Sequence, residues 1–144
     1  MSLVATEVAF GATRARPPHL ADGYAAEALA APEGWTLVAE GDDGAVLGWA
    51  SISPAATSAW AAPATSLAPA AYLGIATVTA SRRSGGVGRA LVERLHEHAR
   101  GEGVAATLLD ASACNPWSVP FWHRQGHRPL WTTWQRRVRP GGAA

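Results

Sequence analysis

The stretch Ser81-Arg-Arg-Ser-Gly-Gly-Val-Gly-Arg-Ala-Leu91 places three glycines between a pair of arginines and an apolar run. Glycine loses more backbone entropy on folding than other residues, so a cluster indicates positive φ angles or the close approach of a ligand. The free N–H groups and the dipole of a first helical turn favour an anion such as phosphate. A plain connection between a strand and a helix is the alternative, and the loop alone does not separate the two.

The flanks of this loop predict a strand, a helix and a second strand. Residues 70–80 are mostly apolar, which indicates a strand buried on both faces. Residues 87–100 have an amphipathic helical pattern that ends at Gly101 and Gly103. Its expected apolar positions are Val87, Leu91, Leu95 and Ala99, with Ala90 beside them. Residues 104–111 read as another buried strand, so the segment is a βαβ unit with parallel strands.

The rest of the chain predicts further strands and helices around this unit. Residues 35–40 and 45–53 are strand-like, and Gly41-Asp-Asp-Gly44 between them is typical of a hairpin turn. We also expect strands over residues 3–10 and 130–138, helices over 19–31 and about 115–125, and a long loop over 54–69. The sequence therefore predicts one α/β domain with a mixed sheet.

Composition limits the class of protein. The chain has 144 residues, 48% of them hydrophobic and 16% charged, which is typical of one globular domain. No apolar run is long enough to span a membrane, and Glu7 interrupts the apolar N-terminal residues, so we expect neither a membrane partner nor a signal peptide. The single Cys114 excludes an internal disulfide framework and suits the cytoplasm.

The charge is divided along the chain. All 12 basic residues are Arg, which excludes a Walker A lysine and a Schiff-base lysine. Residues 1–80 hold two Arg against seven acids, and residues 81–144 hold ten Arg against four acids, so the two parts carry −5 and +6. The excess of arginine in residues 81–144 indicates a site for phosphates, and we expect no nucleic acid partner. A surface of solvated arginines would give the same charge distribution.

Two motifs together resemble a known family. Arg83-Ser-Gly-Gly86-Val-Gly88 matches the R/Q-x-x-G-x-G/A signature of the GNAT superfamily, the acyl-CoA-dependent N-acetyltransferases. Leu108-Leu-Asp-Ala-Ser-Ala-Cys-Asn115, followed by Phe121-Trp122 and Gly126, is similar to the second signature of that family. The resemblance is best over residues 70–127, is only a matter of pattern over 35–53, and hardly extends to 1–34.

The resemblance implies a single GNAT-like domain over residues 1–144, with an atypical or shortened part at 1–34. Its fold would be a mixed, mostly antiparallel sheet flanked by helices, with a central parallel βαβ splay. Acetyl-CoA would be the cosubstrate, with no metal. The implied cofactor-binding residues are Thr77, Val78, Arg83, Ser84, Gly85, Gly86, Val87, Gly88, Arg89 and Asn115. The Val78 amide would also polarise the thioester carbonyl, as in an oxyanion hole.

One position departs from the family pattern. The tyrosine that usually protonates the leaving thiolate falls on Trp122, and an indole N–H cannot give up its proton at useful pH. The candidate catalytic residues are nevertheless Trp122, Val78, Cys114 and Ser118. Cys114 could be a proton donor or an inert buried thiol.

Other groupings of side chains are weaker. Ser118, His123 and Asp110 could form a hydrolase triad, but no G-x-S-x-G elbow surrounds Ser118. His123 and His127 do not predict a metal pair, because Gly126 breaks the helix between them. His96 and His98 are expected at the surface, and Asp110 and Glu40 are candidate bases.

Two functions remain open from the sequence. The first is acetyl transfer from acetyl-CoA to a primary amine, on a small molecule or a protein, by direct attack. The second is a non-catalytic acyl-CoA-binding module of the same fold. Trp60 and Trp117 could line an acceptor pocket or a dimer surface, and an apolar edge at residues 130–138 would favour a homodimer.

Overall fold

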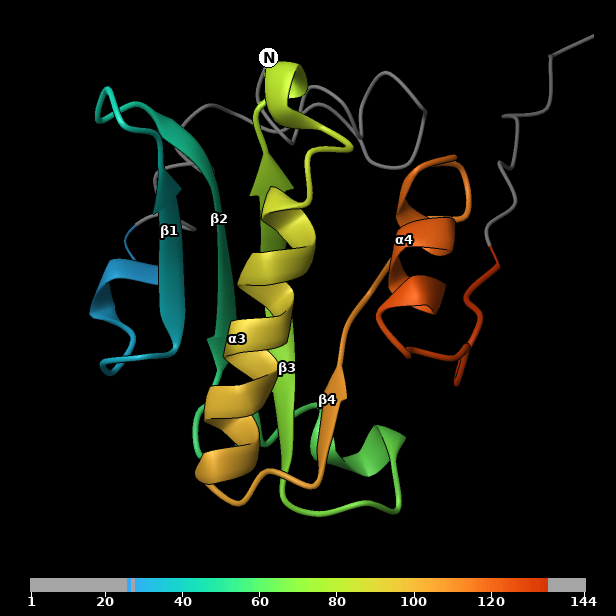
Figure 1. Cartoon of the computed structure of the whole chain (residues 1–144). Coiled ribbons are helices and arrows are strands. Elements are labelled where there is room, and N and C mark those ends of the chain that lie inside the picture. Colours follow the sequence, from blue (N-terminus) through green and yellow to red (C-terminus); the bar gives the residue numbers. More distant parts are fainter. Residues whose placement is uncertain (1–25, 27, 135–144) are drawn as a thin grey trace, which may run out of the picture.

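The computed structural model describes residue 26 and residues 28–134, which form a four-stranded sheet with helices (Figure 1). The sheet order is β1-β2-β3-β4, with β1 at Thr36–Glu40, β2 at Val46–Ser53, β3 at Ala70–Val78 and β4 at Ala106–Leu108. β1, β2 and β3 pair antiparallel, and β3 pairs with β4 in parallel. The mixed α/β fold expected from the sequence is confirmed.

The β1–β2 hairpin has the turn that its sequence predicts. Gly44 has a φ of 75°, a left-handed conformation that glycine adopts at little cost. The Gly41 N–H donates to the Ala45 carbonyl at 2.9 Å, and the Ala45 N–H donates to Asp43 Oδ1 at 3.1 Å. The turn therefore sets the register of the first two strands.

The core lies between the sheet and α3, which spans Val87–Gly101 and lies across one face of the sheet in Figure 1. Four side chains of α3 are buried against β2 and β3: Leu91, Val92, Leu95 and Ala99. The expected fourfold spacing is thus confirmed from Leu91 onward, but Ala90 is exposed and Val92 is fully buried. The apolar stripe of a helix runs through both i+3 and i+4 positions, and Val92 follows that stripe.

The parallel strand pair is shorter than the sequence suggests. β3 and β4 pair only at Ala70↔Ala106, Ala71↔Thr107 and Tyr72↔Leu108. Beyond Leu108 the chain turns away from β3 toward α4, at Ser118–Arg124 (Figure 1). The expectations of buried strands over 70–80 and 104–111 are therefore wrong in part: residues 75–78 and 106–108 are only half-buried. For residues 75–78 the cause is the divergence, which leaves one edge of β3 without a neighbouring strand, whereas residues 106–108 form β4, the last strand in the order of the described sheet.

A bulge interrupts the pairing of β2 with β3. Ser51 pairs with Ile75 and Ile52 pairs with Leu73, so Gly74 has no partner residue on β2. An extra residue on one strand bends that strand locally. The bulge lies midway along β3, near the point where β4 leaves.

The two ends of the described chain bear on the remaining predictions. Ala26 and residues 28–30 are helical, in agreement with the expected helix at 19–31, and the predicted strand at 3–10 lies outside the described residues. Residues 130–134 form no strand, so that part of the strand expected at 130–138 is wrong, and the rest of it lies outside the described residues. Within the described part of the chain, no helix has the length and apolar character to cross a bilayer.

Candidate functional site

The open edge of β3 carries the Val78 amide predicted to polarise a carbonyl. The Thr79 N–H donates to the Leu47 carbonyl at 2.8 Å, so it points toward β2. Successive backbone N–H groups of a strand point to opposite edges. The N–H groups of Val78 and Ala76 therefore point away from β2, toward the gap where β4 has diverged. The resemblance to the family named Val78 as a candidate and did not name Ala76.

The glycine loop lies at the carboxyl end of this edge. Ser84 and Gly86 have φ angles of 65° and 83°, and Gly86 is the N-cap of α3. No side-chain hydrogen bond caps this helix among the described residues, so the first-turn N–H groups have no side-chain acceptor there. A Cβ added at Gly86 would meet nothing within 4 Å. The N–H groups of Arg83 and Gly85 already donate to the carbonyls of Ala80 and Arg82, so it is the first turn of α3 that offers N–H groups to a ligand, as an anion site requires.

Gly88 has a different role from Gly86, because it allows close packing. A Cβ at this position would lie 3.1 Å from Val78 Cγ2 and 3.7 Å from the Phe121 ring. The absence of a side chain thus lets the start of α3 approach both the end of β3 and α4. Three elements that carry predicted site residues meet here.

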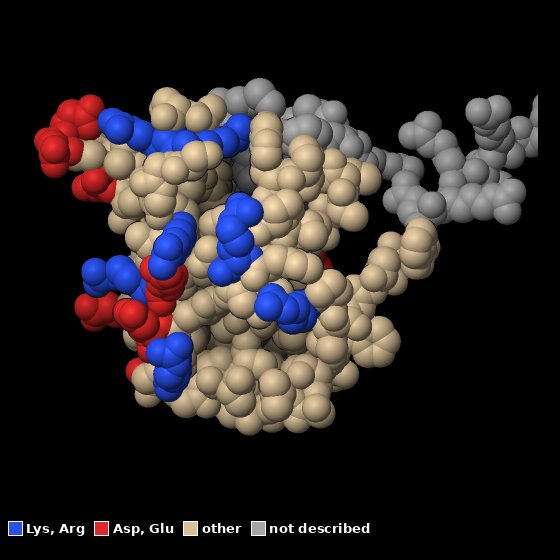
Figure 2. Space-filling view, turned by 45° about the vertical axis from the view of Figure 1, so that its right-hand side comes forward, with Lys and Arg blue, Asp and Glu red and all other residues tan. Residues whose placement is uncertain are grey.

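Arginine side chains gather around this junction. Figure 2 shows basic side chains over the loop, α3 and α4, with acidic side chains among them on α3. The Arg89 Nε donates to Glu93 Oε1 at 2.7 Å, and this bond and the carboxylate charge raise the pKa of Arg89. The Arg83 guanidinium lies over the Trp117 ring, 4.7 Å from its centroid. Trp117 therefore faces the loop rather than the cavity described below.

The segment before α4 contains three more of the predicted residues. The buried Asn115 accepts a hydrogen bond at Oδ1 from the Trp117 N–H at 3.0 Å, which fixes the turn into α4. Cys114 is exposed, so the expectation of a buried thiol is wrong. Its backbone N–H donates to Ser112 Oγ at 3.2 Å.

Trp122, at the position of the family tyrosine, is engaged within its own helix. Its indole N–H donates to Ser118 Oγ at 3.1 Å, one turn earlier. Its ring packs edge-on against Phe121 and His127, with centroids 4.8 and 5.4 Å away. Trp122 and Ser118 are thus brought together by α4 and contact each other.

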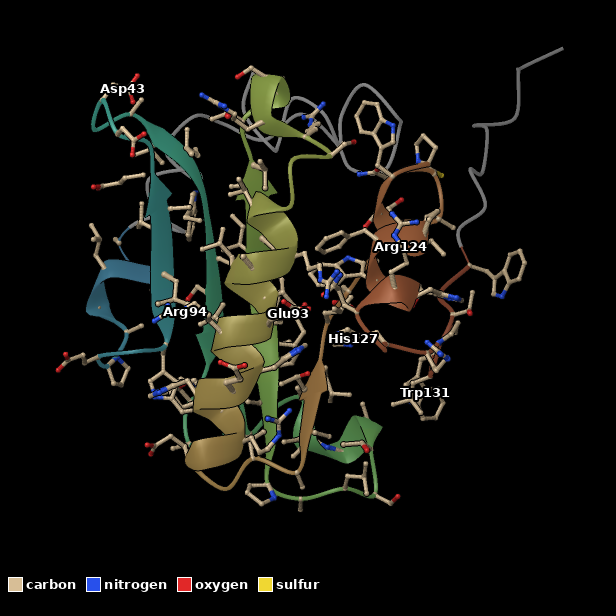
Figure 3. All side chains as sticks on the ribbon, viewed as in Figure 1. Asp43, Glu93, Arg94, Arg124, His127 and Trp131 are labelled. Carbon is tan, nitrogen blue, oxygen red and sulfur yellow. The ribbon has the colours of Figure 1, made fainter. Side chains whose placement is uncertain are left out.

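A histidine pair beside Trp122 was not foreseen from the sequence. The rings of His96 on α3 and His127 after α4 lie 5.3 Å apart, and His127 points into the space between the two helices (Figure 3). Burial, and then the charge of His96, lowers the pKa of His127 to about 4. His96 and His98 are half-buried, so the expectation of surface positions is wrong: Thr107 bonds to His96 and Trp35 packs against His98.

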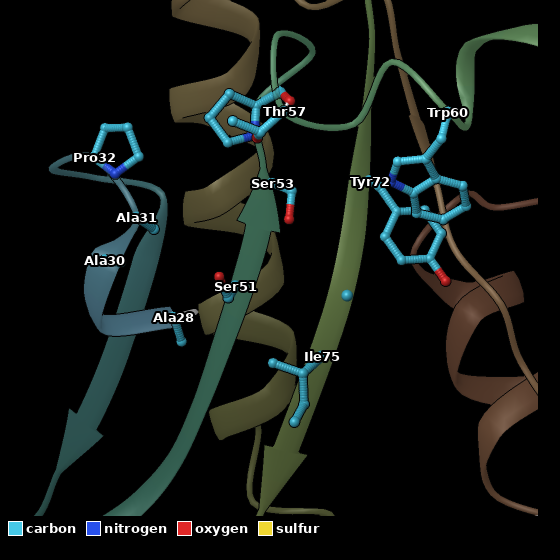
Figure 4. Close-up of a pocket in the computed structure, with 12 residues that line it drawn as sticks. Ala28, Ala30, Ala31, Pro32, Ser51, Ser53, Thr57, Trp60, Tyr72 and Ile75 are labelled. Carbon is cyan, nitrogen blue, oxygen red and sulfur yellow. Dashed lines mark hydrogen bonds between the residues drawn. The ribbon is translucent and has the colours of Figure 1, made fainter. Parts of the chain in front are cut away.

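A cavity of about 590 Å³ opens on the sheet face opposite α3 (Figure 4). Ser51 and Ser53 of β2 and Tyr72, Gly74 and Ile75 of β3 form its floor. One wall is formed by Ala28, Ala30, Ala31 and Pro32, and the other by Pro54, Thr57 and Trp60 of the long loop. Trp60 was expected to line either an acceptor pocket or a dimer surface, and the structure places it at this cavity.

Tyr72 links this cavity to the end of the diverging strand. Its hydroxyl donates to Asp110 Oδ2 at 2.9 Å, and its ring lies 4.6 Å from the Trp60 ring. Asp110 thus bonds to Tyr72, and Ser118 to Trp122, rather than both to His123 as a hydrolase triad would need. No cluster of three or more His, Cys, Asp or Glu suited to a metal ion occurs within residues 28–134.

Solved structures share this architecture. A mutant of the BH1408 protein from Bacillus halodurans has a TM-score of 0.71 and 22% identity, over 94% of this chain and 85% of that one. The aminoglycoside N-acetyltransferase AAC(6')-Iy, in complex with a CoA-containing bisubstrate analogue, has a TM-score of 0.66 and 23% identity, over 97% and 95% of the two chains. A complex of AAC(6')-Iy with CoA has a TM-score of 0.61 and 24% identity, over 85% and 87%. At this identity the likeness shows the fold.

No curated protein matches the chain. A family model, however, agrees with the two motifs and with the fold. The model of the Acetyltransferase (GNAT) family matches residues 7–127, which is most of the sequence and includes the glycine loop, the open edge of β3 and α4. The chain therefore belongs to the GNAT acetyltransferase family.

Proposed function

We propose that this protein transfers an acetyl group from acetyl-CoA to the primary amine of a small molecule. The observation that carries the proposal is the open edge of β3, whose Val78 N–H points into the gap beside the glycine loop. A substrate with an anionic end and an extended arm fits this arrangement, because the arm can pair with the strand edge as an added strand.

Different residues of the site would bind different parts of acetyl-CoA. The backbone from Arg83 to Arg89 would hold the pyrophosphate, with Ser84, Gly85, Gly86, Val87 and Gly88 between them. Thr77 and Val78 would align the pantetheine arm, and the Asn115 segment would close its other side. The Val78 amide, or the Ala76 amide two residues further from the loop, would stabilise negative charge on the thioester oxygen.

The chemistry needs little beyond position and proton transfer. The amine nitrogen forms a bond to the carbonyl carbon, the carbon–sulfur bond breaks, and the amine loses a proton to water or a base. A CoA thiol resembles cysteine, with a pKa of about 8.5, so its thiolate can leave without a tyrosine proton. Trp122 then packs and positions α4, while Cys114 and Ser118 remain candidate proton donors.

A non-catalytic acyl-CoA-binding module is the alternative. The indole N–H of Trp122 is bound to Ser118 and is no acid, which favours this alternative. Both functions require acetyl-CoA to bind, and only the enzyme releases free thiol in the presence of an amine.

Calorimetry with acetyl-CoA and a thiol-release assay over a panel of amines test the proposal. We expect binding, and thiol release that depends on the amine. Binding without release from any amine would favour the module, and no binding at all would overturn both functions.

A further inference from the structure

The cavity on the sheet face opposite α3 has a size and position suited to the acceptor. Its volume of about 590 Å³ is within the range of ligand pockets. Its lining includes Ile75, which is next to Ala76, whose N–H points to the open edge of β3. A molecule in this cavity would therefore lie one residue along the strand from Ala76, the second of the two amides proposed for the thioester oxygen, and three residues from Val78.

The lining of the cavity is uncharged among the described residues. Its twelve described lining residues include no Asp, Glu, Arg or His. Three of its hydroxyls are already paired within the protein: Ser51 with Thr36, Thr57 with the Pro54 carbonyl, and Tyr72 with Asp110. Several positive charges would lose hydration here without gaining carboxylate partners, which is costly. The described lining thus disfavours a polycationic acceptor.

Two aromatic rings form one corner of the cavity. Trp60 and Tyr72 lie 4.6 Å apart and are tilted by 58°, and Trp60 is 66% exposed (Figure 4). Ring faces of this kind favour a planar apolar group. The corner holds the one pair of large rings in the described lining, whose other residues are mostly small.

Buried residues fix the backbone on both sides of the exposed Trp60. Ser58, two residues earlier, is fully buried, and its hydroxyl lies 2.8 Å from the Pro54 carbonyl and 3.2 Å from the Ser53 carbonyl. Ala61, directly after Trp60, is also buried. On the other side, Asp110 orients the Tyr72 ring through their 2.9 Å hydrogen bond. The Tyr72 ring and the backbone that carries Trp60 are therefore in place before any ligand arrives, which lowers the entropy cost of binding.

We propose that the acceptor is a compact monoamine with a planar aromatic body, which packs against Trp60 and Tyr72 while its amine points along β3 toward Ala76. This assignment rests on the proposed acetyl transfer and adds the substrate class. It differs from the aminoglycoside named for AAC(6')-Iy, which carries several amines.

The first test compares amines as acceptors by kcat/KM. The panel is phenethylamine, propylamine, spermidine and kanamycin, each with saturating acetyl-CoA. Burying a phenyl ring is worth about 1.5–3 kcal/mol, so we expect phenethylamine to exceed propylamine by about tenfold or more. A higher kcat/KM for spermidine or kanamycin would overturn the assignment, while the acetyl transfer itself would stand.

The second test uses variants of the long loop. Trp60→Ala should raise the KM for phenethylamine by about tenfold and leave the KM for propylamine and for acetyl-CoA unchanged. Leu67→Ala is the matched control, since Leu67 is a 56% exposed apolar residue of the same loop outside the cavity lining. Equal effects of both variants, or no effect of Trp60→Ala, would overturn the assignment.

A binding measurement separates this inference from the proposed function. Calorimetric titration with phenethylamine in the presence of CoA requires no turnover. Binding that weakens about tenfold in Trp60→Ala supports the cavity assignment even if acetyl-CoA is never consumed. Absence of binding to the wild-type protein, in a sample that turns over other amines, overturns it.

Discussion

The Arg83 guanidinium lies 4.7 Å from the centre of the Trp117 ring, and this contact joins the glycine loop to the segment that leads into α4. Arg83 belongs to the first motif by which the sequence resembles its family, and Trp117 lies between Asn115 and Phe121 of the second. The close approach of Gly88 to Phe121 joins the following elements, the first turn of α3 and α4. The open edge of β3 is thus flanked by two segments that contact each other.

Arg83→Gln should weaken acetyl-CoA binding by about fivefold to tenfold, because it removes a positive charge near the proposed pyrophosphate site and the contact with Trp117. The loss should shrink at high salt, where the charge is screened. Arg94→Gln, on an exposed part of α3, is the control and should bind normally (Figure 3). Calorimetry at two salt concentrations measures both. Equal losses in the two variants would argue against a local role for Arg83.

Gly88→Val should abolish detectable acetyl-CoA binding, because its side chain would enter the space of Val78 Cγ2, 3.1 Å from the first added atom. The start of α3 would have to move away from the strand edge. Gly101→Val is matched to it, since nothing lies within 4 Å of that Cβ. Binding is read from the shift of the melting temperature with CoA. A normal shift in Gly88→Val would mean that the loop is only a connector.

Trp122→Phe should keep most of the activity, with kcat falling less than about tenfold, since the residue lacks a usable proton. It loses the hydrogen bond to Ser118 and part of the packing on His127, so the free energy of unfolding should fall by about 1–2 kcal/mol. Steady-state kinetics and urea unfolding separate the two effects. A hundredfold loss of kcat with intact folding and CoA affinity would assign chemistry to the indole N–H.

The melting temperature should fall as the pH drops from about 6.5 toward 4. An unfolded chain protonates histidine near 6.5, whereas burial lowers the pKa of His127 in the folded protein to about 4, so protons favour unfolding in this window. His127→Phe should flatten the dependence, and the lowered pKa of His96 should leave a smaller slope. His123→Gln, at an exposed position, should behave as wild type. An unchanged slope in His127→Phe would contradict the assignment.

Local signals in the sequence predicted the loop, α3 and the hairpin well. The Gly86 and Gly44 conformations follow from the absence of a Cβ, and the buried side of α3 from Leu91 onward follows from helical periodicity. The rules of sheet topology predicted that β3 and β4 would pair in parallel. They did not predict how many residues would pair, because the two strands diverge after Leu108, where the chain leads to α4.

The contacts of the site could not be predicted, because they join distant segments. Tyr72 and Asp110 are 38 positions apart, and nothing in either segment indicates the partner. The contact of His96 with His127 similarly joins α3 to the residues after α4. At Val78 and Asn115 the prediction came from the resemblance to the family, and their roles in binding acetyl-CoA stay predictions.

The bulge at Gly74 determines which side chains of β3 face the cavity and which face the core, so both the cavity and the proposed acetyl-CoA site depend on it. Before the bulge, Tyr72 faces the cavity and Leu73 the core; after it, Ile75 faces the cavity and Ala76 the core. Deleting this single residue would exchange the two faces for everything downstream, because side chains alternate along a strand. Val78 would then leave its contact with Gly88. A deletion of one residue within β3 should therefore disrupt the site more than a substitution at most positions of the strand.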